Sequence, residues 1–293
     1  MKQILASYNI PCNTNTKQIC CACQLAKSHK LSFFSSTSKA SHHLVLVHSD
    51  LWGPAPILST IGAHYFLLFA DDFSRFTWIY VLHSKDQVSY TFIKFKALVE
   101  TQFNLTIKSL QSDNGGEFKA LASHLAKHGI HHQFSCPYTP EQNGRVERKI
   151  GHIVETGLAF LNTASLPLKF WTYAFQIAVY LINCMPTPTL QHMSPFQIFF
   201  HKLPDYRFFK TFGCLCYPYL RPYSPNKLLH RLAPCIFLGY NLSHKGYLCL
   251  HHSTNRIYIT RLVIFDESNF LFHSSTSLPS SSTSFQPVIT QQF

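Results

Sequence analysis

The sequence predicts an α/β domain followed by a small basic β-barrel, and three observations support this expectation. Strand-like runs come first, between residues 40 and 82, and helical and strand-like patterns then alternate up to residue 185, which is typical of an α/β domain. After about residue 205 only short strand-like runs remain, separated by turn-forming residues. Lys and Arg number 25 against 13 Asp and Glu. The 293 residues suffice for two domains with a sizeable core.

Five strand-like runs are expected in the α/β domain. The first is continuously apolar and therefore predicts a strand buried on both faces. The third is rich in aromatic and β-branched residues, which favour strands. In chain order the runs are Leu44–Val47, Tyr65–Phe69, Phe76–Leu82, Ile107–Gln111 and Ile130–Phe134.

Four helices are expected between and after these strands. Within residues 85–102 apolar residues recur at steps of three and four, which is the spacing of one helix face. Further helices are expected at about 117–128, after Pro140, and at Lys169–Met185, the last being apolar nearly all round and therefore packed under the core. Strands first, then alternating helices and strands, indicate a domain of the ribonuclease H type.

The C-terminal part is expected to be a separate basic module. Nine Lys or Arg and one acid, Asp205, lie between residues 202 and 261. The expected division is a core at 38–204, a small basic β-barrel at 205–272, and a disordered Ser/Thr-rich tail at 273–293. The strand-like runs of the module are Cys214–Tyr219, Cys235–Gly239, Gly246–Leu250, Arg256–Ile259 and Leu262–Phe265.

Composition restricts the class of protein. A formal charge of +12 suits a polyanionic partner, because it attracts one over a long range. No apolar run is long enough for a membrane span. The ten cysteines are scattered, mostly within apolar runs, so they predict a reducing compartment without a disulfide framework. We therefore expect an intracellular protein and not a secreted one.

Three carboxylates stand out as candidate catalytic residues. Asp50 follows the first apolar strand, where burying an uncompensated carboxylate is costly. Asp113 follows the fourth strand on an Asn-Gly-Gly turn, and Glu147 lies in the first turns of a long helix. Three acids converging from two strands and a helix could hold two divalent cations for phosphoryl transfer. The alternative is that Asp113 belongs to an ordinary turn and Glu147 to a surface salt-bridge lattice.

The motifs around these acids resemble those of a retroelement integrase of the Ty1/copia type, found in plant retrotransposons. The resemblance covers roughly residues 18–272. Together, and in this order, the motifs are highly specific. They are Cys20-x-x-Cys23, His48-Ser49-Asp50-Leu51-Trp52-Gly53-Pro54, Phe69-Ala70-Asp71-Asp72-Phe73-Ser74-Arg75, Asp113-Asn114-Gly115-Gly116-Glu117-Phe118 and Pro140-Glu141-Gln142-Asn143-Gly144-Arg145-Val146-Glu147-Arg148-Lys149.

The resemblance implies a ribonuclease H-like integrase core with an SH3-like module after it. Asp50, Asp113 and Glu147 match the Asp-Asp-Glu triad of the family, which binds two Mg²⁺ or Mn²⁺ ions. The implied reactions are 3′-end processing of the element's DNA and strand transfer into target DNA, by an enzyme that forms homo-oligomers. Arg145 stands where the family usually has a small apolar residue.

Nucleic-acid contacts are expected around the acids and on the basic module. Asp72 and Arg75 are expected to form a structural turn and not to contact nucleic acid. The residues expected to contact nucleic acid are Asn114, Asn143, Arg145, Arg148 and Lys149.

The N-terminal residues 1–37 are expected to be the remnant of a zinc-binding region. Cys20 and Cys23 have the spacing of half a zinc site. The family places two histidines upstream of this pair, whereas the first histidine here is His29. Zinc binding is therefore expected to be weak or absent, and two free thiols are the alternative. Substitute ligands would be His29, His42 and His43.

Two other functions stay open. One is a ribonuclease H-like nuclease, for which a fourth acid near the metals is expected and no clear candidate is evident. The other is an inactive nucleic-acid-binding relic of a retrotransposon. For the basic module, binding of duplex DNA competes with a purely structural role.

Overall fold

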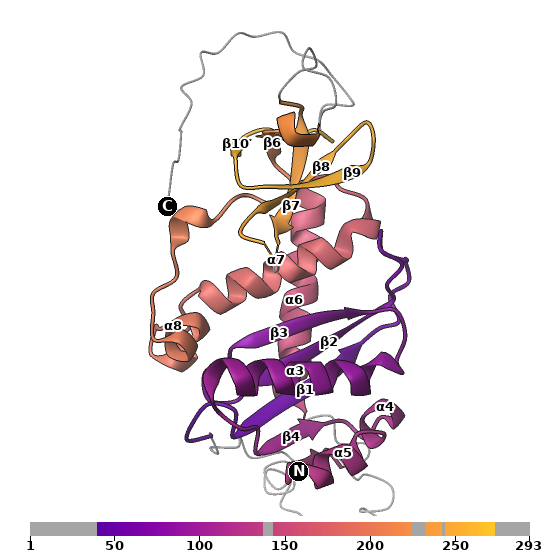
Figure 1. The fold of residues 1–293 in the computed structure, drawn as a ribbon, viewed down its shortest axis with the longest axis vertical. Helices are drawn as coiled ribbons and strands as arrows, with labels where there is room; N and C mark the ends of the chain where they lie inside the picture. The colour runs from indigo at the N-terminus through magenta and orange to yellow at the C-terminus, as the bar shows by residue number, and fades with distance from the viewer. Residues whose placement is uncertain (1–39, 137–142, 224–231, 242–243, 273–293) are drawn as a thin grey trace, which may run out of the picture. The chain divides into compact units, whose positions relative to one another are not determined.

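The computed structural model describes residues 40–136, 143–223, 232–241 and 244–272 (Figure 1). The expected zinc-binding remnant with Cys20, Cys23 and His29 lies outside the described residues, as does the Ser/Thr-rich tail.

The first sheet has the five expected strands in the order β3-β2-β1-β4-β5. β1 pairs antiparallel with β2 and parallel with β4, and the pairs β2–β3 and β4–β5 are antiparallel and parallel respectively. This mixed sheet confirms the predicted ribonuclease H type of fold. The strands are β1 (Leu46–Trp52), β2 (Tyr65–Asp71), β3 (Thr77–Leu82), β4 (Ser109–Ser112) and β5 (His131–Phe134).

The extent of β1 differs from the expectation. The strand was expected to end at Val47, with Asp50 after it, but it continues to Trp52. Asp50 is opposite Leu68, and Trp52 is opposite Phe66, across the antiparallel ladder with β2. Asp50 is therefore inside a strand, because pairing with a neighbour extends the strand beyond its apolar run.

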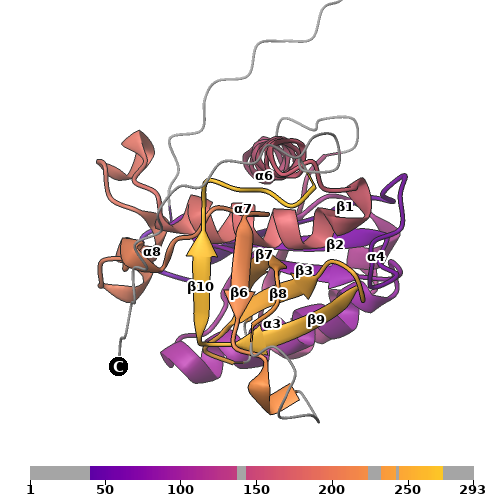
Figure 2. The same cartoon turned by 90° about the horizontal axis from the view of Figure 1, so that it is seen from above.

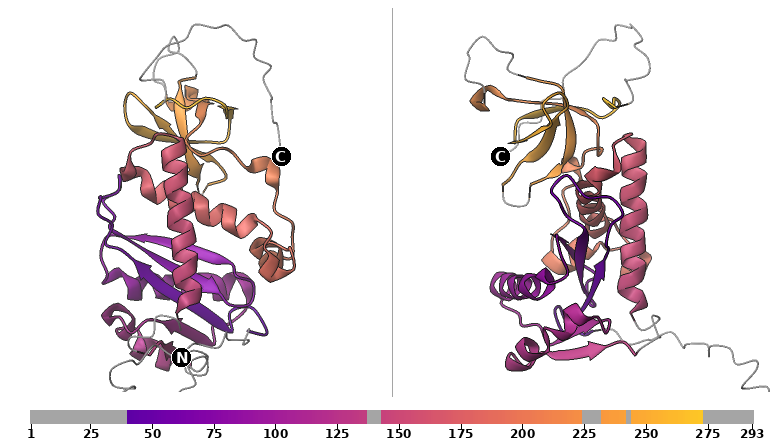
Figure 3. Two further views of the ribbon diagram at one scale, coloured as in Figure 1. Left: turned by 180° about the vertical axis from the view of Figure 1, so that it is seen from behind. Right: turned by 90° about the vertical axis from the view of Figure 1, so that its right-hand side faces the viewer.

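Helices cover both faces of this sheet (Figure 3). Successive residues of β2 point to opposite faces. Leu67 and Phe69 pack with α3 (Gln87–Phe103), and the rings of Phe69 and Phe95 stack at 4.2 Å between centroids. Phe66 and Leu68 pack on the other face with α6 (Gly144–Thr163) and α7 (Trp171–Cys184).

The helix expected at 117–128 is interrupted. Two short helices, α4 (Gly116–Lys119) and α5 (Ala122–Lys127), take its place. The backbone N–H of Leu121 donates to the carbonyl of Phe118, three residues back, so the turn tightens between the two helices.

α7 is buried against the sheet and α6, as its apolar composition predicts. Gly157 of α6 allows close packing, because a Cβ atom there would lie 2.2 Å from a ring carbon of Phe175. The side chain of Asn183 ties α7 to β3: Thr77 N donates to Asn183 Oδ1 at 2.9 Å, and Asn183 Nδ2 donates to Thr77 O at 2.8 Å. Shorter elements are η2 (Leu168–Phe170), η3 (Pro188–Leu190), α8 (Pro195–Phe200), η4 (Tyr206–Phe208) and η5 (Arg221–Tyr223).

The second sheet is antiparallel throughout, in the order β10-β6-β7-β8-β9 (Figure 2). Its architecture is consistent with the expected SH3-like module, and each of its strands was expected within two residues of where it lies. The strands are β6 (Leu215–Pro218), β7 (Cys235–Tyr240), β8 (Tyr247–His251), β9 (Arg256–Thr260) and β10 (Val263–Asp266).

The second sheet shares its hydrophobic core with α7. Phe237 of β7 and Ile177 of α7 belong to one buried cluster. Gly239, with φ of +139°, lies so close to α7 that a Cβ atom there would be 3.2 Å from Ile177. The module therefore packs on α7 of the first domain.

The cysteines in the described part of the chain are free thiols. Cys214, Cys216, Cys235 and Cys249 are fully buried within the module, as small hydrophobic residues. None of the helices in the described ranges is both long enough and apolar enough to cross a membrane.

Candidate active site

The three expected catalytic acids lie on elements that meet near one end of the first sheet. β1 and β4 are parallel neighbours, with His48 opposite Gln111. Asp50 and Asp113 are each two residues beyond this pair, so parallel pairing brings them to corresponding positions on adjacent segments of chain. Glu147 lies in the first turn of α6, and α6 packs on β1.

The carboxylate of Asp50 is electrostatically coupled to the other acids. Burial raises the pKa of Asp50 to about 7, and the negative charge of Asp113 contributes next. The backbone N–H of Leu51 donates to Asp50 at 2.9 Å and opposes the rise. Glu147 and Glu117 raise the pKa further. Neighbouring carboxylates thus disfavour the charged form of Asp50, whereas the side chain of Glu147 itself is exposed.

Electrostatic proximity is not the same as a preformed metal site. Within the described ranges, no three His, Cys, Asp or Glu side chains converge closely enough to hold a metal ion. The donors themselves are carboxylate oxygens, which are the ligands that Mg²⁺ and Mn²⁺ prefer.

Glu117 is a fourth acid that the sequence reasoning missed. It lies in the first turn of α4, its side chain is 13% exposed, and Lys85 Nζ is 3.4 Å from its Oε1. The sequence feature that indicates Glu117 is its position four residues after Asp113 in the Asp-Asn-Gly-Gly-Glu segment. The expectation of no clear fourth acid was therefore wrong.

Gly115 creates the space in which Asp113 and Glu117 approach each other. A Cβ atom on Gly115 would lie 2.9 Å from the Glu117 carboxyl group and 3.0 Å from Asp113 Oδ1. The backbone N–H of Gly115 donates to Asp113 Oδ1 at 3.1 Å. A side chain at position 115 would compete with both carboxylates for the same space.

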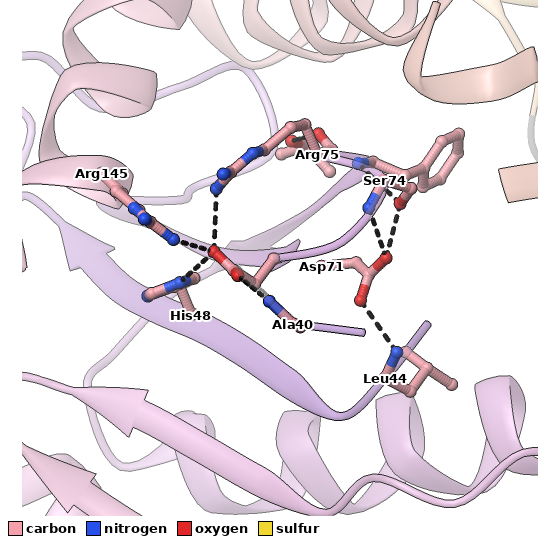
Figure 4. Close-up of polar contacts among 10 residues, drawn as sticks. Ala40, Leu44, His48, Asp71, Ser74, Arg75 and Arg145 are labelled. Atoms are coloured by element: carbon pink, nitrogen blue, oxygen red, sulfur yellow. Dashed lines mark hydrogen bonds and ion pairs between the residues drawn. The ribbon is translucent and has the colours of Figure 1, made fainter. Parts of the chain in front are cut away.

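The structural turn expected at Asp72 and Arg75 follows Asp71, the last residue of β2, and Figure 4 shows Asp71, Ser74 and Arg75 at this turn. Asp71 is fully buried and accepts hydrogen bonds from Leu44 N at 2.8 Å, Ser74 N at 2.9 Å and Ser74 Oγ at 2.6 Å. His43 Nδ1 lies 3.3 Å from Asp71 Oδ2. His43, one of the possible substitute zinc ligands, is thus engaged with this turn.

Asp72 is surrounded by donors and cations. Its Oδ1 interacts with His48 Nε2 at 3.0 Å, with Arg75 Nη1 at 2.8 Å and with Arg145 Nη1, and its Oδ2 accepts from Ala40 N at 2.8 Å. Burial would raise the pKa of Asp72. Hydrogen bonds from His48 and Ala40 and the charge of Arg75 outweigh burial and hold this pKa well below its usual range.

The residues expected to contact nucleic acid differ in accessibility. Asn114 and Arg148 are exposed, Arg145 and Lys149 are half-buried, and Asn143 is buried with 2% of its surface exposed. The guanidinium of Arg145 forms an ion pair with the buried carboxylate of Asp72. Burial lowers the pKa of Lys149 to about 8, with a smaller contribution from the charge of Arg75.

Two domain families match this chain. Residues 40–140 match the integrase core domain, and residues 214–278 match the retroviral polymerase SH3-like domain.

The chain is also similar to parts of plant retrotransposon polyproteins. It is 48% identical over 277 residues to the retrovirus-related Pol polyprotein from transposon RE2 of Arabidopsis thaliana, covering 94% of this chain and 19% of the polyprotein. It is 38% identical over 269 residues to that from transposon TNT 1-94 of Nicotiana tabacum, covering 91% of this chain and 20% of the polyprotein. The chain thus spans about a fifth of the length of these relatives.

One solved structure shares the fold over most of the chain. It is that of a simian T-cell lymphotropic virus intasome in complex with the PP2A regulatory subunit B56 gamma, with a TM-score of 0.50 at 16% identity, covering 83% of this chain and 86% of that chain. At this identity the likeness concerns the fold alone.

Proposed function

Because the chain belongs to the integrase region of copia-type retrotransposon Pol polyproteins, we propose that it is a metal-dependent polynucleotidyl transferase that performs 3′-end processing and strand transfer. A role in DNA integration follows from the integrase core domain. The observation that supports the specific chemistry is the coupling of Asp50 to Asp113, Glu147 and Glu117.

In this proposal Asp50, Asp113 and Glu147 hold two Mg²⁺ or Mn²⁺ ions. The donor set fits, because partial burial and the charges of neighbouring acids raise the pKa of the Asp50 carboxylate, and a divalent cation would compensate these charges. Two such ions stabilise the attacking and the leaving oxygen of a phosphoryl transfer. Tight zinc binding is not part of the proposal.

The other residues bind and orient DNA. Arg148 and Asn114 are exposed and would contact phosphates, as would the half-buried Lys149 and Arg145. Asn143, the N-cap of α6, is too buried to contact DNA directly. Such contacts position the backbone and carry little sequence information. The SH3-like module would add phosphate contacts, and the active form would be a homo-oligomer in the nucleus or a cytoplasmic particle. The expected domain limits, 38–204 and 205–272, are part of the same proposal.

A strand-transfer assay tests the proposal. Short blunt duplexes are incubated with the chain and Mg²⁺ or Mn²⁺, and joined products are resolved by size. Wild type should join strands, and Asp113→Asn should not. Asp86→Asn is the matched control, because Asp86 is an exposed carboxylate at the start of α3 whose side chain makes no capping bond. Joined products from Asp113→Asn would contradict the proposal.

A metal-dependent nuclease is the second candidate, and Glu117 favours it. A fourth acid is what the ribonuclease H alternative calls for, and Glu117 is coupled to Asp50. The same assay separates the two, since a nuclease releases shortened strands and joins none. An inactive relic would bind the duplexes and produce neither product.

A further inference from the structure

The carboxylate of Asp72 links the two elements that carry Asp50 and Glu147. Asp72 follows β2, is 1% exposed, and is bonded both to His48 on β1 and to Arg145 on α6. A single buried group therefore contacts a strand and a helix that are distant in sequence.

Each partner lies two residues before a proposed catalytic acid. Residues two apart on a strand point to the same face, so His48 and Asp50 share one face of β1. That face is the one covered by α6 and α7, because Trp52, the next residue in the same alternation, packs into their core, whereas Val47 and Leu51 pack with α3. Arg145 and Glu147 both lie in the first turn of α6.

Apolar packing alone does not fix the start of α6. Val146 and Ile150 bury the helix against the core, but apolar contacts are not directional. Asn143, at the N-cap, makes no side-chain capping bond. A charge-assisted bond from Arg145 to a buried carboxylate is directional, and it restricts rotation and sliding of the first turn, where Glu147 is located.

We propose that Asp72 is a positioning residue, which holds His48 and Arg145 and thereby sets the separation of Asp50 and Glu147. This inference rests on the proposed function, in which those two acids bind metal ions. Asp72 is bonded throughout to protein donors and takes no part in the chemistry itself. Arg145, expected to contact DNA, has a positioning role here as well.

Metal binding by the full chain without DNA provides the decisive test. Mn²⁺ affinity is measured by titration calorimetry for wild type, Arg145→Ala and Arg145→Lys. Removing a positive charge beside Glu147 should tighten Mn²⁺ binding if only direct electrostatics act. If Arg145 positions Glu147, Arg145→Ala should instead weaken Mn²⁺ binding by about tenfold, as for other residues that orient metal ligands. Arg145→Lys, which keeps the positive charge, should recover most of the Mn²⁺ affinity.

A second variant separates positioning from contact with DNA. Asp72→Asn keeps the size of a side chain that is too buried to touch DNA, so it should lower kcat for strand transfer about tenfold and leave KM for DNA unchanged. Lys96→Ala is the control, because it removes an ion pair with Glu100 on α3, across the sheet from α6.

The outcomes distinguish the two proposals. Mn²⁺ binding that is unchanged or tighter in Arg145→Ala overturns the positioning role. A rise in the KM of Asp72→Asn for DNA, without a fall in kcat, also overturns it. A wild type that joins no strands but binds Mn²⁺ more tightly than Arg145→Ala supports positioning and overturns the proposed function. A wild type that binds no Mn²⁺ overturns both.

Discussion

Asp50 lies on β1 and Asp72 follows the neighbouring strand β2. The surroundings of the two carboxylates shift their pKa values in opposite directions. Asp50 is accompanied by three other acids, and burial and these charges raise its pKa to about 7. Asp72 is accompanied by two arginines and a histidine, and hydrogen bonds from His48 and Ala40 and the charge of Arg75 hold its pKa well below the usual range. One region concentrates negative charge, whereas the other neutralises it.

The difference distinguishes the proposed metal site at Asp50 from the structural site at Asp72. Burying a carboxylate is costly unless a cation or hydrogen-bond donors compensate. The protein supplies that compensation to Asp72 from its own side chains. At Asp50 the carboxylate accepts a hydrogen bond from the backbone N–H of Leu51, and a cation from solution would provide the remaining compensation. This contrast distinguishes acids that fold the domain from acids that would act on a substrate.

The largest effect is expected from Asp50→Asn on activity. The substitution removes a proposed metal ligand, and because the metal ions contribute several kcal/mol to catalysis, strand transfer should fall at least about a hundredfold. Rates are measured with Mg²⁺ and again with Mn²⁺. If Asp72→Asn lost as much activity as Asp50→Asn, the division between binding and structural acids would be wrong.

Asp72→Ala should produce the largest loss of stability. It leaves Arg75, Arg145 and His48 without their buried partner, and breaking such a pair costs about 3–5 kcal/mol. The free energy of unfolding is measured with urea. Asp205→Ala breaks an exposed ion pair with Arg207 and a capping bond to Arg207 N and serves as the control, for which a much smaller loss is expected. Equal effects of the two substitutions would contradict the structural role of Asp72.

The pH dependence of stability should have opposite signs at the two acids. In metal-free protein the raised pKa of Asp50 means that the folded state binds more protons between about pH 4 and 7, so stability falls as pH rises through this window. Asp50→Asn should therefore stabilise the metal-free chain at pH 8, by about 1–2 kcal/mol after allowance for solvent screening.

The lowered pKa of Asp72 acts in the other direction. The stabilisation it provides is present above the unfolded pKa of about 3.8 and is lost as pH falls below it. Urea unfolding from pH 4 to 8, with EDTA present, measures the contribution of Asp50. An Asp50→Asn profile parallel to that of wild type would show that Asp50 does not titrate in this range.

A smaller effect is expected from Gly115→Ala. The added Cβ would press on the Glu117 carboxyl group at 2.9 Å and on Asp113 Oδ1 at 3.0 Å, so Mn²⁺ binding should weaken by about tenfold, as when groups that orient metal ligands are disturbed. Gly116→Ala is a close control, because nothing lies within 4 Å of its Cβ position. Equal Mn²⁺ affinities of the two variants would show that Gly115 and Glu117 are not part of the metal site.

The smallest effect concerns the basic module. Lys245 and Arg256 are exposed on it. If each neutralises one phosphate, replacing both with Gln should reduce the slope of log Kd for duplex DNA against log salt concentration by about two. Lys96→Gln on α3 is the control. An unchanged salt slope would favour a purely structural module, consistent with its shared core with α7.

The sequence by itself determined the elements and their order. Apolar runs and helical spacing placed the strands of both sheets and the long helices, because these patterns depend on neighbours a few residues away. It also identified Asp50, Asp113 and Glu147 as candidates through their motifs. Local pattern could not determine the extent of β1, which continues through Asp50 only because β2 pairs with it.

The tertiary structure decided which charges meet. Arg145 resembles a DNA-binding residue in sequence, but folding brings it to Asp72, 73 positions away. Glu117 resembles a surface acid, but the space left by Gly115 places it beside Asp113. Electrostatic interactions depend on distance in space and on burial, and neither quantity is encoded in the spacing of residues along the chain.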